Sequence, residues 1–167
     1  MVDTTENDNF DPNFEKVDSG ASLSVPLSIS DVKKGTHILM DGRPCKVVDI
    51  ATSKTGKHGH AKANITGIDI FTGKKYTDVS PVSHSKDSPN INRTEYTILS
   101  VDEENYVTMI DKVGSVRQDL RLPNDVDDDK ETCDKIRSLL EEGRTVLCTV
   151  LSAMKIEKIE DAKEATN

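Results

Sequence analysis

From residue 22 onward, apolar and polar residues follow the pattern of short β-strands. Leu23, Val25 and Leu27 alternate with polar residues, and an apolar run at 38–40 leads into a turn signal that begins at Asp41. Six of the nine glycines lie between positions 35 and 73, and no helical stretch of about ten residues occurs before position 89. These features predict a small β-barrel or strongly bent sheet over residues 22–89.

The second half of the chain shows a different order of elements. Three short strands with a half-buried pattern are predicted at 96–101, 105–110 and 115–122. A helix is expected after Asp127, and the apolar run at 145–154 predicts a further strand. Strands, then a helix, then a strand is the order of an OB-fold barrel, which we expect over residues 90–155.

The predicted helix carries signals at both of its ends. Asp128 and Glu131 stand at the spacing of a capping box, and carboxylates suit the positive end of the helix dipole. Gly143 has the position of a C′ residue just past the helix. An apolar stripe is formed by Cys133, Ile136, Leu139 and Leu140. The helix is therefore expected to pack on the sheet.

Both ends of the chain, and the link between its halves, are polar. Residues 1–21 form an acidic leader without a sustained period, and we expect this leader to be disordered. Residues 156–167 are predicted to be a solvated tail in the form of a frayed helix, because Lys and Glu recur there. The polar, strand-poor segment 82–93 is the expected domain boundary.

Apolar runs and cysteines bear on the cellular compartment. No apolar run approaches the roughly 20 residues of a transmembrane helix, and the amino terminus lacks the basic-then-apolar pattern of a signal peptide. We therefore expect a cytoplasmic protein with no membrane partner. Cys45, Cys133 and Cys148 are odd in number, widely spaced and set in apolar segments, which predicts reduced, buried thiols.

Charge is distributed unevenly along the chain, whose formal net charge is −8. Residues 31–76 carry nine Lys and Arg against four Asp, while residues 1–30 and 94–167 are acidic. A basic module in an acidic protein is either an ordinary solvated surface or a face that binds phosphates. The candidate RNA-binding residues on this module are Lys33, Lys34, Lys46, Lys54 and Lys62.

The basic stretch 51–62 contains glycines and no apolar side chain larger than alanine. It lies between two β-like runs, which predicts the tip of a long hairpin with Lys57 at its apex. Gly56 and Gly59 flank this lysine, and glycine permits positive φ and a close approach of the backbone to a partner. The pattern indicates a loop that presents one amine.

Three other kinds of site that contain a lysine or histidines can be tested against the residues of this loop. A phosphate-binding P-loop would need a glycine at Ala51 and a Ser or Thr at His58. Two histidines, His58 and His60, make only half of a metal site, so no metal is expected. A Schiff-base lysine needs an apolar pocket, which the neighbouring Lys54 and Lys62 do not provide. We therefore expect no catalytic residue.

The loop resembles the modification loop of the eukaryotic translation initiation factor 5A family, in which one lysine becomes hypusine. Further blocks match in the same order at 67–76, 119–123 and 150–154, so the resemblance covers about residues 35–154. By position, the modified lysine falls on Lys57. The surrounding modification loop comprises Thr52, Ser53, Lys54, Thr55, Gly56, His58, Gly59, His60, Ala61 and Lys62.

The resemblance implies a fold and a function. The fold is an SH3-like barrel followed by an OB-fold barrel that carries one helix. The function is that of a translation factor that binds the ribosome, through rRNA and peptidyl-tRNA, and promotes peptide-bond formation at slow sequences such as proline runs, and termination. Deoxyhypusine synthase would transfer an aminobutyl group from spermidine to Lys57, and deoxyhypusine hydroxylase would then add a hydroxyl. The protein itself would bind no cofactor and would not be an enzyme.

Two features depart from the family pattern, and the residues alone leave alternatives open. Ala51 stands where serine is more usual, and Ala63 with Asn64 replaces a valine–histidine pair. A generic RNA-binding OB-fold adapter without hypusine and a small lysine-dependent enzyme remain as alternatives. The acidic second domain has only Tyr96 and Tyr106 as aromatic residues, so we expect it to position the first domain by shape rather than to stack bases.

Overall fold

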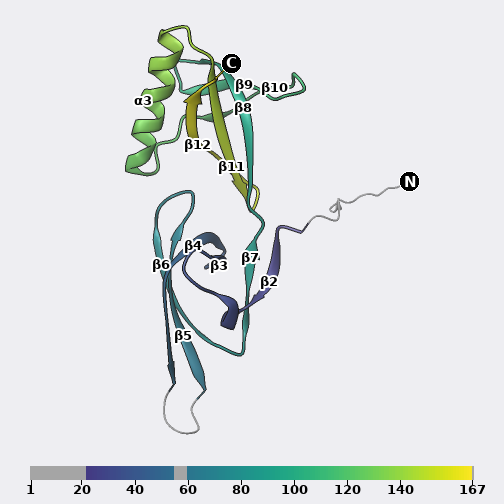
Figure 1. Ribbon diagram of the computed structural model, residues 1–167, viewed down its shortest axis with the longest axis vertical. Coiled ribbons are helices and arrows are strands. Elements are labelled where there is room, and N and C mark those ends of the chain that lie inside the picture. The colour runs from purple at the N-terminus through teal and green to yellow at the C-terminus, as the bar shows by residue number, and fades with distance from the viewer. Residues whose placement is uncertain (1–21, 55–59, 167) are drawn as a thin grey trace, which may run out of the picture.

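The computed structural model describes residues 22–54 and 60–166 and shows two β-rich units stacked along one long axis (Figure 1). The amino-terminal unit ends with strand β7, and the carboxy-terminal unit begins with strand β8. Within the described ranges a single α-helix accompanies these strands. The prediction of a mainly β protein is therefore confirmed.

The amino-terminal unit is built on a four-stranded antiparallel sheet in the order β3-β4-β5-β6. Its strands are β3 (His37–Met40), β4 (Arg43–Lys54), β5 (Ala61–Asp69) and β6 (Lys75–Pro81). A separate ribbon pairs β2 (Ser24–Ser28) with β7 (Ser85–Pro89), and the 3-10 turn η1 (Ile29–Asp31) follows β2. The ribbon is joined to β3 by a hydrogen bond of 2.8 Å from the Ser88 hydroxyl to the His37 carbonyl oxygen.

One turn of this unit follows its sequence signal, and one strand does not. Asp41 and Gly42 join β3 to β4 with φ values of 54° and 78°, as a two-residue hairpin turn requires. The strand β7, however, lies in the segment 82–93 that we predicted to be strand-poor. Its polar residues pair with β2 along the whole strand, because the backbone ladder itself needs no apolar side chains.

The core of the amino-terminal unit lies between this sheet and the ribbon. It consists of Ile29, Val32, Ile38, Met40, Cys45, Val47, Ala63 and Ile65. Gly67 in β5 permits close packing here, because a Cβ at this position would lie 2.6 Å from the Met40 sulfur. The sheet can therefore bend tightly over a small core.

The carboxy-terminal unit is a five-stranded antiparallel sheet in the order β10-β9-β8-β11-β12. Its strands are β8 (Asn92–Val101), β9 (Tyr106–Ile110), β10 (Val116–Arg121), β11 (Val146–Ala153) and β12 (Ile156–Glu164). The two edge strands meet where Arg117 of β10 binds Glu157 of β12 at 2.7 Å. Arg117 also binds Asp119 at 2.7 Å and donates to the Tyr96 hydroxyl at 3.2 Å. The sheet is thereby curled into a barrel.

The last strand corrects our prediction for residues 156–167. Rather than a solvated, frayed helix, β12 pairs with β11 over its whole length, and the barrel continues beyond residue 155. The apolar residues Ile156, Ile159 and Ala162 recur at every third position, which resembles a helical period. The segment is nevertheless a strand. Ile159 and Ala162 both reach the barrel core because a register shift between them breaks the usual alternation, whereas Ile156 packs against a separate cluster that contains Phe71.

The helix α3 (Asp127–Glu141) lies against one side of this barrel (Figure 1). Ile136 is fully buried, and Leu139 and Leu140 pack against the same core, as the apolar stripe predicts. Gly143 follows the helix with a φ of 71°, which confirms it as the C′ residue. In the described ranges, no helix is both long and apolar enough to cross a membrane.

At its amino-terminal end the helix is capped by a residue other than the predicted pair. Asp129 Oδ2 accepts hydrogen bonds from the backbone amides of Asp125 at 2.7 Å and Val126 at 3.0 Å. The predicted capping pair, Asp128 and Glu131, is therefore wrong. Asp129 is also buried, which indicates that it has further partners.

Two of the three cysteines are buried, as predicted. Burial raises the pKa of the Cys45 and Cys148 thiols to about 11, so both are protonated and unreactive at neutral pH. Cys133 is only partly buried, contrary to the prediction. Its thiol donates a hydrogen bond of 3.1 Å to the Pro123 carbonyl oxygen.

The two units meet through an apolar contact and one buried charge. Phe71, Leu151 and Ala153 form a small core at this junction. Beside this core, the Lys158 ammonium donates to the Phe71 carbonyl oxygen at 2.8 Å and binds Asp129 at 2.9 Å. The side chains of Lys158 and Asp129 are only 11% and 5% exposed. A lysine of β12 thus ties the start of α3 to the amino-terminal unit.

Candidate functional site

Strands β4 and β5 form a long hairpin that carries the stretch singled out in the sequence. The last described backbone pair is Lys54 opposite Ala61, preceded by Ser53 opposite Lys62. The strands therefore extend well into the stretch 51–62 that we predicted as a loop. The connection between them is reduced to residues 55–60.

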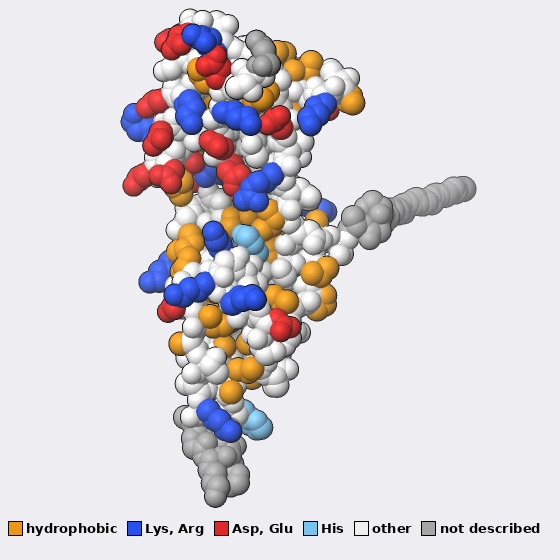
Figure 2. Space-filling model, viewed as in Figure 1, with side chains coloured by type: hydrophobic (Ala, Val, Ile, Leu, Met, Phe, Trp, Pro, Cys, Tyr) orange, Lys and Arg blue, Asp and Glu red, His pale blue; other side chains and the backbone are white. Residues whose placement is uncertain are grey.

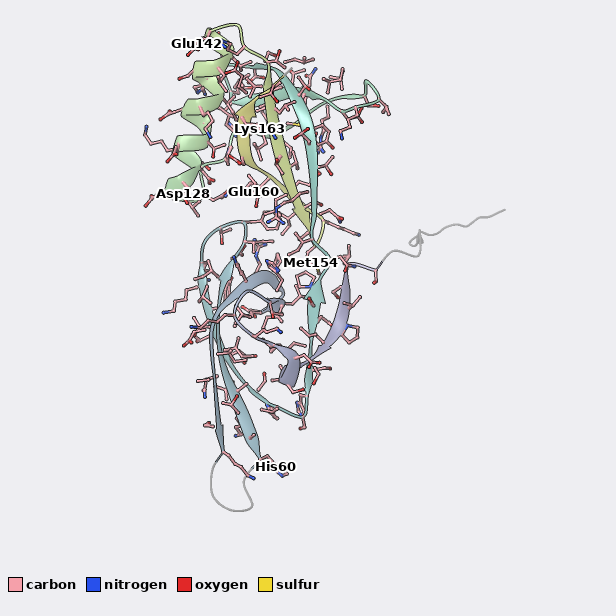
Figure 3. All side chains as sticks on the ribbon, viewed as in Figure 1. His60, Asp128, Glu142, Met154, Glu160 and Lys163 are labelled. Carbon is pink, nitrogen blue, oxygen red and sulfur yellow. The ribbon has the colours of Figure 1, made fainter. Side chains whose placement is uncertain are left out.

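The apex of the hairpin is not among the described residues. Five of the predicted loop residues lie outside the described ranges: Thr55, Gly56, Lys57, His58 and Gly59. Figure 3 shows His60, which precedes β5, at the end of the molecule opposite Glu142 of the carboxy-terminal unit. The hairpin thus projects away from that unit.

Side chains near the described end of the hairpin face solvent. Thr52, Ser53, Lys54, His60 and Lys62 are all exposed, and Ala61 is half-buried. Burial begins only with Ala63, which is 1% exposed, while Asn64 beside it is exposed. The backbone is nevertheless supported up to the start of β5, because the Val82 amide donates to the Ala61 carbonyl oxygen at 3.0 Å. The result is an exposed arm with a braced backbone.

The predicted basic residues of the hairpin do not share one face. Directly paired residues project to the same side of a sheet, and sides alternate along each strand. Lys46 is paired with Ile68, and the register places Lys46 and Lys62 on the face away from the core. Lys54, paired with Ala61, projects to the other side. Positive charge is therefore available on both sides of the arm.

The remaining two predicted residues lie apart from the hairpin. Lys33 and Lys34 are exposed in the connection between η1 and β3. None of the five predicted lysines is paired with a carboxylate of residues 22–54 or 60–166. In the same unit the Arg43–Asp69 pair, by contrast, has an N–O distance of 2.7 Å. The five amines are therefore not neutralised by the described part of the chain.

Lys46 also affects a histidine at the base of the hairpin. His37 lies directly opposite Lys46 in the pairing of β3 with β4. Burial lowers the pKa of His37 below 6.5, and the charges of Lys46 and Arg93 lower it further. His37 is therefore neutral at pH 7 and adds nothing to the positive charge of this unit.

The turn between β5 and β6 has a role that its local sequence does not indicate. Asp69 accepts hydrogen bonds from the Phe71 amide at 2.8 Å, the Thr72 amide at 3.2 Å and Arg43 Nε at 2.7 Å. Burial raises the pKa of Asp69, but these donors outweigh it and hold the pKa below 3.8. The ionised Asp69 thus fixes the turn that carries Phe71 to the junction.

Charge is divided between the two units as the sequence predicts. On the face shown in Figure 2, carboxylates gather on the carboxy-terminal unit, and Lys and Arg outnumber them on the amino-terminal unit. Across residues 22–54 and 60–166, no three His, Cys, Asp or Glu side chains come together as a metal site would require. The reactive groups that the described part of the hairpin presents are therefore exposed lysine amines, whose positive charge attracts anions.

Two family models match the chain and together cover most of it. Residues 22–84 match the model described as "Translation initiation factor 5A-like, N-terminal". Residues 90–163 match the model described as "Eukaryotic elongation factor 5A hypusine, DNA-binding OB fold". The predicted fold class, an SH3-like barrel followed by an OB-fold barrel, is confirmed by these matches and by the observed strands and helix.

Individual proteins are similar to this chain over nearly its whole length. Eukaryotic translation initiation factor 5A of Dictyostelium discoideum is 46% identical over 154 residues, covering 92% of this chain and 93% of that protein. Eukaryotic translation initiation factor 5A-3 of Arabidopsis thaliana is 42% identical over 90% of this chain and 93% of its own length.

A solved structure agrees with these relatives. The translation initiation factor eif-5a family protein from Naegleria fowleri ATCC 30863 has a TM-score of 0.77 and 47% identity, covering 85% of this chain and 99% of that chain. Sequence, fold and the basic hairpin all point to the same assignment. The chain belongs to the translation initiation factor 5A family and is a translation factor.

Proposed function

We propose that this protein is a cytoplasmic translation factor that binds the ribosome beside peptidyl-tRNA, between the P and E sites, and acts through a hypusine made from Lys57. The modified side chain promotes peptide-bond formation at slow sequences such as proline runs, and termination. The observation that carries this proposal is the braced, exposed hairpin, whose described strands end at Lys54 and Ala61, with His60 at the far end of the molecule.

Hypusine formation would change what a single lysine can do. Deoxyhypusine synthase transfers an aminobutyl group from spermidine to the lysine amine, and deoxyhypusine hydroxylase then adds a hydroxyl. The side chain gains length, a second cationic nitrogen and a hydroxyl. A slim dication can enter a narrow channel lined by RNA and contact phosphate and 2′-hydroxyl oxygens that the planar guanidinium of arginine is too bulky to reach.

The hairpin supports this role by its position and its exposure. A modifying enzyme needs access to the lysine from several directions, and the side chains on both approaches to the segment are small or solvent-exposed. After modification, the braced backbone would let the arm hold the acceptor end of peptidyl-tRNA. Orienting a mobile substrate lowers an entropic barrier without supplying any reacting group. The chemistry therefore belongs to the ribosome, and the protein is not an enzyme.

The lysines of the amino-terminal unit would supply affinity for the ribosome. Lys33, Lys34, Lys46, Lys54 and Lys62 are exposed and are not paired with described carboxylates. Neutralising phosphates with lysines releases counterions, so such binding weakens steeply as salt increases.

The decisive test is an intact-mass measurement of the protein purified from its native cells. We expect a stoichiometric increment equal to an aminobutyl group plus one oxygen, located on Lys57 by fragmentation. A fully unmodified protein that still binds RNA would favour the adapter without hypusine and would overturn the proposal.

A substitution tests the role of the modified residue. Lys57→Arg keeps a positive charge but cannot accept the aminobutyl group, and we expect it to change the free energy of unfolding by less than about 0.5 kcal/mol. Stimulation of peptide-bond formation at proline runs should be lost. A Lys57→Arg protein that still stimulated this reaction on purified ribosomes would contradict the proposed function.

A further inference from the structure

The arginines of the carboxy-terminal unit fall into two classes. Three of them bind carboxylates at 2.7 Å: Arg93 with Glu160, Arg117 with Asp119 and Glu157, and Arg144 with Glu164. Arg121 and Arg137 have no carboxylate partner among residues 22–54 and 60–166. Since this unit is strongly acidic, two arginines without such a partner stand out from their surroundings.

Both of these arginines are held on the turn between β8 and β9. Arg121 donates through Nε and Nη2 to the Glu104 carbonyl oxygen, at 3.0 and 2.7 Å. Arg137 of α3 donates through Nη2 to the side-chain oxygen of Asn105, the next residue. The turn itself is fixed, because Asp102 Oδ1 accepts from the Glu104 amide at 2.8 Å. Two guanidinium groups are thus brought together on neutral partners, with N–H donors to spare.

The two arginines line one open cleft of about 710 Å³ between α3 and the segment that follows β10. Lys130 also lines it but binds the Asp134 carboxylate at 3.0 Å, and Asp127 is the single carboxylate among the lining residues. The wall between them is apolar and includes Leu122, Pro123 and Val126. Two arginines without a described carboxylate partner face one lining carboxylate, so the cleft has the charge of an anion-binding site although the surrounding unit is acidic.

An aromatic ring beside the cleft favours a nucleic-acid ligand. The guanidinium of Arg121 lies 5.0 Å from the centre of the Tyr106 ring, and this tyrosine is 37% exposed. An exposed ring next to cationic groups can take a base while the cations take the adjacent phosphate. An acidic peptide would use the cations but would gain nothing from the ring.

We propose that this cleft is a second RNA-binding site, in which Arg121 and Arg137 bind the phosphates of a single-stranded segment and Tyr106 stacks on a base. The site lies on the acidic unit, away from the hairpin and its lysines, and it departs from the expectation that this unit acts by shape and stacks no bases. It needs no hypusine, so it stands or falls separately from the proposed function.

The test uses the unmodified full-length protein and a fluorescein-labelled ribo-oligonucleotide of about 10 uridines, within the span of a single OB fold. Affinity is measured by anisotropy for Arg121→Gln/Arg137→Gln and for the control Arg93→Gln/Arg144→Gln. Both double variants lose two positive charges, but the control removes arginines already bound to carboxylates. We expect the first variant to weaken binding about tenfold or more and the control to weaken it less than about threefold. Equal weakening would overturn the site.

Two further measurements locate the ligand and identify its class. In amide NMR spectra, the oligonucleotide should shift signals of the β8–β9 turn and of α3, and shifts confined to the amino-terminal unit would overturn the proposal. Tyr106→Leu should weaken binding while leaving its salt dependence unchanged. Displacement of the RNA by a polyglutamate peptide at equal charge concentration would indicate an acidic protein partner and would likewise overturn the proposal.

A gain of affinity provides a test that does not depend on removing any cation. Asp127→Asn removes the carboxylate that lines the cleft, so RNA binding should tighten by about threefold and become more dependent on salt. Asp128→Asn, the next residue along the helix, is the matched control, because Asp128 does not line the cleft. If the two variants bind RNA equally, the site is refuted, even if the arginine variants fail to fold.

Discussion

Replacement of Lys158 by methionine tests the junction between the two units most directly. Methionine keeps most of the aliphatic length of the side chain but removes the ammonium, which donates to the Phe71 carbonyl oxygen at 2.8 Å and binds Asp129 at 2.9 Å. The packing of the stem is therefore largely preserved. What is lost is one charge and its hydrogen bonds.

The expected cost follows from the burial of the partner. Asp129 is 5% exposed, so in Lys158→Met its carboxylate stays buried without its cation. Removing one member of a buried pair typically costs about 3–5 kcal/mol. Asp129 keeps its hydrogen bonds from the Asp125 and Val126 amides, which favours the lower end, about 3 kcal/mol. Lys158→Met combined with Asp129→Asn should recover part of this loss, because no unpaired charge remains.

The assay is urea unfolding followed by far-ultraviolet circular dichroism, which suits a chain without tryptophan. Lys163→Met is the matched control, because Lys163 lies on the same strand but its side chain is 69% exposed and its nearest carboxylate oxygen is 3.8 Å away. This control should change the free energy of unfolding by less than about 0.5 kcal/mol. Equal losses in Lys158→Met and Lys163→Met would refute the idea that the buried pair stabilises the junction.

The pH dependence of the unsubstituted protein gives an independent check. Burial raises the pKa of Asp129, but Lys158 and the Val126 and Asp125 amides outweigh it and hold the pKa below 3.8. A carboxyl with a depressed pKa contributes stability that is present above its unfolded pKa and is lost as the pH falls through the folded value. This contribution should therefore be constant above about pH 5 and be lost progressively as the pH falls below about 4. In Lys158→Met that acid-dependent part should shrink.

Three further predictions concern the junction turn, the basic face and the barrel. Gly73→Ala should destabilise the protein by more than the roughly 1–2 kcal/mol that a non-glycine residue costs at positive φ, because its Cβ would lie 2.6 Å from the Val126 side chain at the start of α3. Gly143→Ala has a similar φ but open space around its Cβ, so in urea unfolding it should cost only the strain of the positive φ. Lys46→Gln should lower the slope of log affinity against log salt for ribosome binding by about 0.7–0.9, and Lys163→Gln should leave it unchanged. Arg117→Leu should cost about 1–2 kcal/mol in the same unfolding assay, since its carboxylate partners are partly solvated.

The elements that local patterns specify were predictable from the sequence. Asp41 and Gly42 mark a turn whose backbone only a few residue types adopt, and Gly143 marks a helix end for the same reason. The helix itself follows from its acidic start and the stripe that includes Ile136. In each case the physical cause lies within a few residues of the signal.

The elements that were missed depend on distant parts of the chain. β7 has polar side chains and exists because β2, some sixty residues earlier, supplies its hydrogen-bond partners. Lys158 was counted within a solvated tail, yet its ammonium is buried between residues of both units. A similar limit applies to the site. The motif around Lys57 identifies the lysine, but only strand pairing shows that Lys46 and Lys54 lie on opposite sides of the hairpin.

The junction also bears on how the proposed function could depend on the second unit. His60 and Glu142 mark opposite ends of the molecule, so contacts of the second unit can fix the position of the hairpin only if the junction holds one angle (Figure 3). An apolar contact such as Phe71 against Leu151 can slide, because dispersion and hydrophobic forces have little directionality. The Lys158 ammonium, by contrast, is satisfied only where a carbonyl oxygen of one unit and a carboxylate of the other are both within reach. On the proposed function, Lys158→Met should therefore leave Lys57 fully modified while reducing stimulation of peptide-bond formation, and a defect confined to modification would show that the junction serves the modifying enzyme instead.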